Sequence, residues 1–116
     1  MDDSIVRGNT MRQLVAMLID AGAAEVHVRI SSPRVVSPCF YGIDMADEDE
    51  LAAAHRSVEE MRMLIGATSL YYLSLEGMQE ATRLPEDAVC RACFTREYPT
   101  HVPRKVEKLR FEPARA

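Results

Sequence analysis

Apolar residues recur at helical spacing near the start of the chain, at the i, i+3, i+4, i+7 and i+8 positions of one face. The stripe consists of Met11, Leu14, Val15, Leu18 and Ile19. This spacing predicts a helix over residues 10–21 with one side against a core, and Gly22 is placed to end it. Residues 25–30 then alternate polar and β-branched apolar side chains, which predicts a strand.

The middle of the chain carries clear helix signals. Asp47 and Glu50 can begin a short helix that reaches about residue 55. Ser57 and Glu60 have the spacing of a capping box, and Gly66 is placed to close the helix that follows. The predicted inner face of that helix consists of Val58, Met61, Leu64 and Ile65.

The remaining pattern predicts one strand, one helix and irregular segments. Residues 69–73 form a short strand, Ser74 caps a helix over residues 75–82, and Pro85 breaks the helical pattern. Residues 31–44 and the chain from residue 85 onward show no stable period, so both are predicted to be loops. Helix followed by strand in this order favours an α/β fold.

Composition and charge narrow the class of protein. The chain has 116 residues, 47% of them apolar and 28% charged, with a net charge of −4, as expected for one globular domain. No apolar run approaches the roughly 20 residues of a membrane span, and the acidic start is unlike a secretory signal, so we expect a cytoplasmic protein. The basic residues of the tail, 104–116, lack the aromatic or glycine interleaving of nucleic-acid binders.

The opening segment, DDSIVRGNT, joins two carboxylates to a turn that leads into the first helix. Backbone N–H groups of such a turn, with a helix dipole behind them, favour an anion such as phosphate. Asp2 and Asp3 would repel that anion unless they face sugar hydroxyls or Mg²⁺. The alternative is that both carboxylates are solvated and that Asn9 or Thr10 only caps a helix.

Three cysteines lie in the two predicted loops. Cys39 belongs to loop 31–44, and Cys90 and Cys93 form a C-x-x-C pair in loop 85–103. An odd number argues against a disulfide scaffold, and three thiolates are one short of a Cys₄ metal site. Inert thiols remain an alternative, as does a zinc site. The histidines that could complete such a zinc site are His27, His55 and His101.

The opening segment resembles the phosphoribosyl pyrophosphate (PRPP) motif of type I phosphoribosyltransferases, in the form typical of amidophosphoribosyltransferases. The segments AEVHVRISSPRVVSPCFYGID, SLYYLSLEG and CRACFTREYPT resemble the same family in the same order, up to about residue 102. The resemblance implies an α/β fold that is a truncated piece of a phosphoribosyltransferase domain. Residues 1–103 would form this piece, with the PRPP motif at 1–10, and 104–116 would be a disordered basic tail.

The resemblance also implies site residues and cofactors. Asp2 and Asp3 would contact the ribose hydroxyls and Mg²⁺. The turn that holds the 5′-phosphate would consist of Ser4, Ile5, Val6, Arg7, Gly8, Asn9 and Thr10. In the iron–sulfur branch of the family, Cys39, Cys90 and Cys93 match three of the four ligands of a [4Fe–4S] cluster, and the fourth ligand is absent from this chain.

The implied activity is conversion of PRPP and glutamine to 5-phosphoribosylamine, the first step of de novo purine synthesis. Because the family's glutaminase domain has no counterpart in these 116 residues, we expect a C-terminal fragment that is inactive alone. A complementing N-terminal chain could restore the enzyme, which is homo-oligomeric in the family. The alternative is a small non-catalytic module that binds PRPP or phosphate, or a zinc knuckle.

Overall fold

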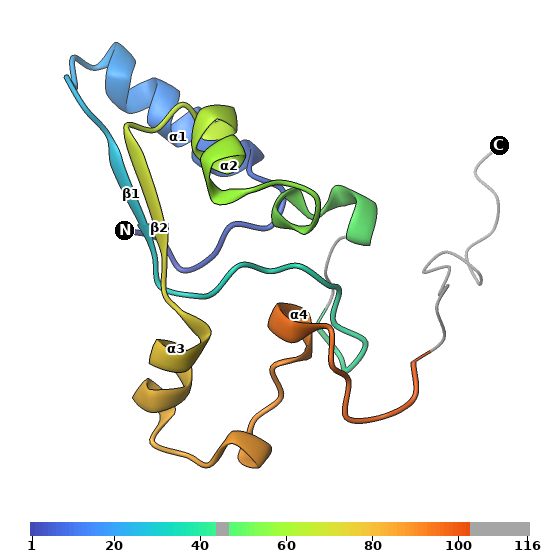
Figure 1. Cartoon of the computed structure of the whole chain (residues 1–116). Coiled ribbons are helices and arrows are strands. Elements are labelled where there is room, and N and C mark those ends of the chain that lie inside the picture. Colours follow the sequence, from blue (N-terminus) through green and yellow to red (C-terminus); the bar gives the residue numbers. More distant parts are fainter. Residues whose placement is uncertain (44–46, 103–116) are drawn as a thin grey trace, which may run out of the picture.

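The computed structural model describes residues 1–43 and 47–102 (Figure 1). Its helices are α1 (Asn9–Asp20), α2 (Val58–Ile65), α3 (Leu75–Thr82) and α4 (Ala92–Thr95), its strands are β1 (His27–Ile30) and β2 (Ser69–Tyr72), and its 3₁₀ turns are η1 (Glu48–Glu50), η2 (Ala52–Ala54) and η3 (Glu86–Ala88). The α/β fold predicted from the sequence is therefore confirmed. Residues 44 and 103, where two loop predictions end, and the tail 104–116 lie outside the described residues.

The two strands form a small parallel sheet in which Val28 lies opposite Leu70 and Ile30 opposite Tyr72. Asp2 adds an isolated parallel bridge to Ile30 on the other edge of β1. The Asp2 N–H donates to the Arg29 carbonyl at 3.0 Å, and the Ser31 N–H donates to the Asp2 carbonyl at 3.0 Å. The opening turn is thereby fixed at the carboxyl end of β1, the edge where parallel sheets bind ligands.

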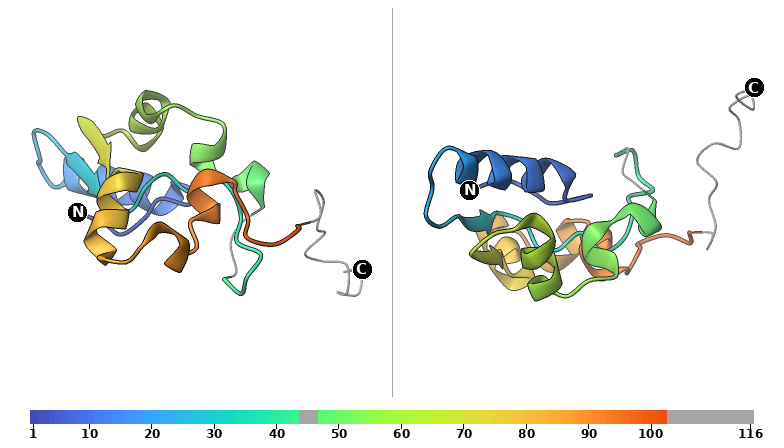
Figure 2. Two further views of the ribbon diagram at one scale, coloured as in Figure 1. Left: turned by 60° about the horizontal axis from the view of Figure 1, so that its bottom comes forward. Right: turned by 90° about the horizontal axis from the view of Figure 1, so that it is seen from above.

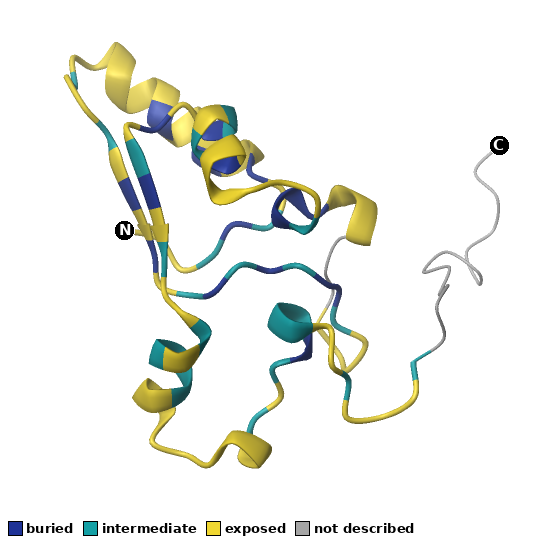
Figure 3. Ribbon diagram, in the orientation of Figure 1, coloured by how far each residue is buried: buried dark blue, intermediate teal, exposed yellow. Residues whose placement is uncertain are grey.

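Helices α1 and α2 lie side by side and cover one face of the sheet (Figures 1 and 2). Val28, Ile30 and Leu70 point into the core, whereas His27 and Arg29 lie on the opposite, exposed face of β1. Figure 3 shows the same division along the ribbon. The core cluster consists of Ile5, Met11, Val15, Val28, Ile30, Ala52, Met61, Ile65, Ala67 and Leu70.

The predicted apolar stripe of α1 is only partly buried. Met11 and Val15 pack in the core, but Leu14, Leu18 and Ile19 are 40%, 41% and 48% exposed. Within the described chain, the stripe therefore faces a core only at Met11 and Val15. The reason is that α2 covers only one side of α1, so the outer part of the stripe has no neighbouring element to bury it.

Helix termini follow the local signals closely. The Ser57 side chain accepts from the Glu60 N–H while the Glu60 carboxylate accepts from the Ser57 N–H, so the predicted capping box of α2 is confirmed. Ser74 accepts from the Gly77 N–H and caps α3, which has the predicted bounds. Helix α1 begins at Asn9 and ends at Asp20, one residue earlier at each end than predicted.

Two local predictions are wrong. The short helix expected over residues 47–55 is instead two 3₁₀ turns, because Leu51 between them is extended (φ −72°, ψ 109°) and wholly buried. The segment from residue 85 onward, expected to be irregular, contains η3 and α4. Ala92 anchors α4 because its side chain is buried. None of the helices within residues 1–43 and 47–102 has both the length and the apolar character of a membrane span.

Candidate functional site

Ten consecutive residues at the start of the chain, 2–11, line one hollow of about 460 Å³. All of the residues predicted to hold the sugar phosphate, 2–10, are among them, so the structure brings these candidates together. The turn is anchored from below because Ile5 is buried in the core at 3% exposure. Asp2 and Asp3, at the beginning of the turn, are exposed to solvent.

The two carboxylates at the rim are held by hydrogen bonds within the turn. The Asp3 N–H donates to Oδ1 of Asp2 at 2.9 Å, and the Ser4 hydroxyl donates to Oδ1 of Asp3 at 3.3 Å. Each carboxylate has about four acceptor positions, so these single bonds leave oxygen atoms for a ligand. The pair can therefore accept hydrogen bonds from hydroxyls or coordinate a hard cation.

Gly8 is the residue that turns the chain into α1. It has φ 86° and is the N-cap, without a side-chain hydrogen bond to the helix. A Cβ there would meet Leu64, Ala52 and Met61 at 3.7–3.8 Å, which is ordinary van der Waals contact. The position therefore favours glycine because of its left-handed conformation and not because space is short.

The main-chain bonds of α1 start with Arg12 N–H to the Gly8 carbonyl at 3.0 Å. The amides of Asn9, Thr10 and Met11 precede this bond, and the N-terminal amides of a helix are donors for an anion. The earlier idea that Asn9 or Thr10 caps the helix is wrong, because the cap is Gly8.

Sequence reasoning missed the second support of the turn, which comes from residues 48–54. The Ala52 N–H donates to the Val6 carbonyl at 2.9 Å, and the Arg7 guanidinium lies 3.0 Å from Oε2 of Glu50. More than half of each of these two side chains is exposed, so the ion pair contributes little stability by itself. The contact spans 43 positions of sequence, which no local pattern could indicate.

The two cysteine-bearing loops meet in the structure. The carbonyl of Cys93 accepts from the Val36 N–H at 2.9 Å and from the Ser37 N–H at 3.1 Å. Figure 2 shows α4, which carries Cys93, beside the segment that leads to Cys39. Cys39 and Cys93 are partly buried and Cys90 is exposed, and all three are free thiols.

Tyr98 connects the two cysteine-bearing loops through hydrogen bonds and ring contacts. This residue was not singled out from the sequence. Its hydroxyl donates to the Pro38 carbonyl at 2.6 Å and also bonds the Ser37 hydroxyl. Its ring centroid lies 5.3 Å from that of Phe40 and 6.2 Å from that of Tyr41, within the range of aromatic pairing. These contacts of Tyr98 fix the backbone on both sides of Cys39 relative to the segment after Cys93.

Burial raises the pKa of the Cys93 thiol, and nearby Cys39 and Cys90 raise the pKa further because the thiolates would repel one another. Burial likewise raises the pKa of Tyr98, against the hydrogen bond from Ser37, which lowers it. Cys39 and Cys90 therefore lie close enough to Cys93 to affect the ionisation of its thiol. Even so, no three His, Cys, Asp or Glu side chains in residues 1–43 and 47–102 are arranged as ligands of one metal ion.

The candidate histidine ligands lie elsewhere. His27 bonds the Ser69 hydroxyl through Nδ1 at 2.8 Å and Glu25 through Nε2 at 3.0 Å, on the exposed face of the sheet. Both of its ring nitrogens thus have partners. His55 and His101 are exposed. None of the three joins a group of metal-ligand arrangement in the part of the chain that the structure describes.

Known proteins similar to this chain include several amidophosphoribosyltransferases. No family model matches the chain. The chain is 55% identical over 110 residues to an amidophosphoribosyltransferase from Synechococcus elongatus and 53% identical over 104 residues to one from Archaeoglobus fulgidus. These alignments cover 95% and 88% of this chain, but 22% and 23% of the relatives. The chain thus spans less than a quarter of the curated relatives it matches.

Solved structures agree with the sequence comparison. The chain superimposes with a TM-score of 0.81, at 50% identity, on a glutamine PRPP amidotransferase from B. subtilis complexed with ADP and GMP, covering 92% of this chain and 25% of that one. A structure described as the allosteric regulatory enzyme of purine biosynthesis gives a TM-score of 0.81 at 51% identity. By sequence and by fold, the chain corresponds to one segment of the amidophosphoribosyltransferases.

Proposed function

We propose that this chain provides the PRPP-binding turn of an amidophosphoribosyltransferase. The observation that carries the proposal is that residues 2–11 line a single hollow at the carboxyl end of β1, with the start of α1 at its edge. This arrangement suits a ligand with one phosphate and one diol, because amides and carboxylates lie at opposite ends of the same short turn. PRPP has both groups.

Different residues of the turn would bind the phosphate and the ribose of PRPP. Main-chain amides from Gly8 to Thr10 and the hydroxyls of Ser4 and Thr10 would hold the 5′-phosphate, while Asp2 and Asp3 would accept hydrogen bonds from the ribose hydroxyls. The same two carboxylates fit Mg²⁺, which proteins often hold through one or two carboxylates together with substrate phosphates. When bound, Mg²⁺ would offset the negative charge of the pyrophosphate leaving group.

Binding of PRPP is the direct test. Titration of the chain with PRPP and Mg²⁺ by calorimetry should give saturable binding that Asp2→Asn and Asp3→Asn each weaken by about tenfold or more, since a charge-assisted hydrogen bond contributes about 1.5–3 kcal/mol. Asp20→Asn is the matched control, because Asp20 is an exposed carboxylate at the far end of α1. Equal loss in all three variants, or no binding of PRPP by the unchanged chain, would contradict the proposal.

Cys39, Cys90 and Cys93 would serve as three ligands of a [4Fe–4S] cluster. Supporting this, the Cys39 and Cys93 loops are hydrogen-bonded to each other, and Cys39 and Cys90 both raise the pKa of the Cys93 thiol. The donor set suits iron–sulfur chemistry, for which thiolates are the usual ligands. The chain has three cysteines, so a fourth cysteine ligand would come from another polypeptide segment.

Metal content after anaerobic reconstitution distinguishes the cluster from a zinc knuckle. We expect brown protein that contains iron and inorganic sulfide, with Cys93→Ser losing both. Tyr71→Phe is a control on an exposed aromatic residue and should retain them. Stoichiometric zinc in place of iron would favour the knuckle, and iron retained after Cys93→Ser would exclude that residue as a ligand.

The complete amidotransferase reaction would require further polypeptide. The chain matches 22–25% of the related proteins, and release of ammonia from glutamine would be the task of residues outside that portion. The edge of β1 that carries the Asp2 bridge is the position at which such a polypeptide would extend the sheet. The exposed apolar side of α1, at Leu14, Leu18 and Ile19, would lie against the same partner or a second copy.

A further inference from the structure

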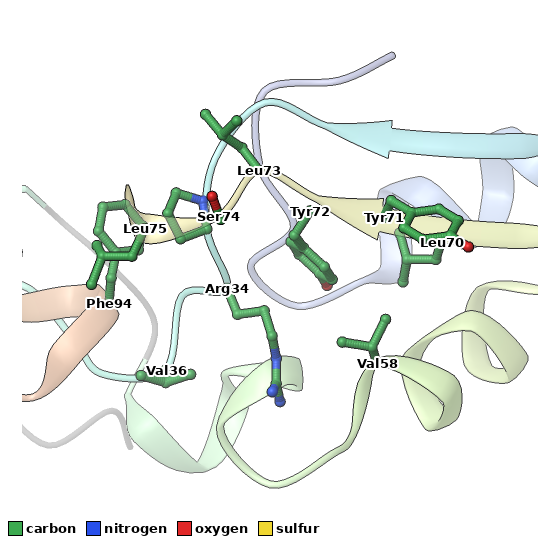
Figure 4. Close-up of a pocket in the computed structure, with 11 residues that line it drawn as sticks. Arg34, Val36, Val58, Leu70, Tyr71, Tyr72, Leu73, Ser74, Leu75 and Phe94 are labelled. Carbon is green, nitrogen blue, oxygen red and sulfur yellow. The ribbon is translucent and has the colours of Figure 1, made fainter. Parts of the chain in front are cut away.

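A second cavity, separate from the opening turn, lies between β2, the segment after β1, α2 and α4 (Figure 4). Its volume is about 470 Å³, which is within the range of small-molecule sites. It shares no lining residue with the hollow formed by residues 2–11. The cavity and the hollow are therefore formed by different residues.

Two polar atoms in the wall of this cavity are buried without a partner. They are Nε of Arg34 and the hydroxyl oxygen of Tyr72, and neither has a hydrogen-bond partner in the described chain. Figure 4 shows both side chains extending into the same space from neighbouring segments. Because a buried polar group without a partner costs about 1–3 kcal/mol, such atoms indicate a place where a ligand supplies the missing bond.

Arg34 is held in position but its charge is not balanced. One of its terminal nitrogens donates to the Ala53 carbonyl at 2.9 Å and to the Arg56 carbonyl. No carboxylate of residues 1–43 and 47–102 lies within ion-pair distance of it. The two carbonyls fix the guanidinium, and its buried Nε–H has no partner in the described chain. A fixed guanidinium without a counter-charge is suited to an anion.

Tyr72 supports the same choice of ligand. Burial raises the pKa of its hydroxyl, and the charge of Arg34 opposes this by lowering the pKa. The net shift is upward, so the phenol is protonated at neutral pH and can donate a hydrogen bond. Arg34 Nε–H and Tyr72 O–H therefore offer two donors to one acceptor group, and an anionic oxygen satisfies both.

The rest of the cavity is apolar. The side chains of Val36, Val58, Leu75 and Phe94 form its walls. We propose that this cavity is a binding site for a small organic anion with an apolar body, whose charged oxygens lie between Arg34 and Tyr72. The proposal does not depend on the proposed PRPP function, because no residue of the opening turn takes part.

The test uses three probes of similar shape on the 116-residue chain: phenylacetate, phenyl phosphate and neutral phenylacetamide. We expect saturable binding of at least one anion in NMR titrations, with shifts of the Arg34 Nε–H and Tyr72 ring signals, and at least tenfold weaker binding of phenylacetamide. The stronger of the two anions identifies the carboxylate or phosphate class. Equal affinity for the amide, or absence of shifts at Arg34 and Tyr72 for both anions, would overturn the proposal.

Variants separate the site from general effects on folding. Tyr72→Phe removes one donor and keeps the ring, so we expect several-fold weaker anion binding with PRPP binding unchanged. Arg34→Met should abolish the preference for anions, with retained circular dichroism as the check on folding, and Arg12→Met, an exposed arginine of α1, is the matched control. Anion binding that survives Tyr72→Phe and Arg34→Met unchanged would contradict the assignment.

Discussion

Met61→Ala is expected to lower the free energy of unfolding by about 3 kcal/mol, within the range for truncating a buried large side chain. Met61 is completely buried in α2 and belongs to the core cluster together with Met11 and Val15 of α1. Its terminal methyl also lies near Gly8, at the start of α1. Removing the side chain would leave a cavity beneath the opening turn. Urea denaturation followed by circular dichroism measures the change.

Met63→Ala is the matched control for this prediction. It makes the same chemical change two residues further along the same helix, but Met63 is 59% exposed. Its effect should be within about 0.5 kcal/mol of zero, as for other surface substitutions. If both variants lost the same stability, the face of α2 that contacts α1 would not be the one described here.

Gly8→Ala is the second change with a large expected effect, because it acts on both stability and binding. Gly8 has φ 86°, and an L-residue in the left-handed region costs about 1–2 kcal/mol. A turn that relaxes to negative φ would also redirect the amides of Asn9 and Thr10 away from the hollow. We therefore expect PRPP affinity, measured by calorimetry with Mg²⁺, to fall by about tenfold or more.

Gly22→Ala provides the comparison. Gly22 also has positive φ, 103°, and a Cβ there would meet no atom within 4 Å. It follows α1 at the end remote from the hollow, where its N–H donates to the Ile19 carbonyl. The strain and the loss of stability should therefore be similar to those of Gly8→Ala, while PRPP affinity stays unchanged. Unchanged affinity in Gly8→Ala would mean that the turn does not hold the phosphate.

Several predictions based on neighbouring residues were accurate. The capping box of Ser57 and Glu60, the Ser74 cap of α3 and the glycine after α2 each depend on bonds across three or four residues, and all are present. Strand β1 was correct in type, but its pairing with β2 spans 42 residues, from His27 to Ser69. The α4 helix was missed because four residues, Ala92–Thr95, carry too short a pattern to recognise.

The candidate site divides in the same way. The opening turn was found because the residues that line its hollow, 2–11, are contiguous, so a motif could contain the whole surface. Tyr98, which connects the cysteine-bearing loops, was missed because its partners Ser37 and Pro38 lie about 60 positions earlier in the sequence. The cavity of Arg34 and Tyr72 was missed for the same reason, since its walls come from segments between residues 33 and 94.

The sequence by itself determined helices α1, α2 and α3, the caps of α2 and α3, and the turn that resembles a PRPP motif. Those features depend on local dihedral preference and short-range hydrogen bonds. Only the tertiary structure decided which part of the α1 stripe is buried, that Asp2 joins the edge of β1, and that the cysteine loops meet. These outcomes depend on which surfaces pack together across long loops. Residue pattern indicates that a side chain can be buried, and the neighbouring elements determine whether it is.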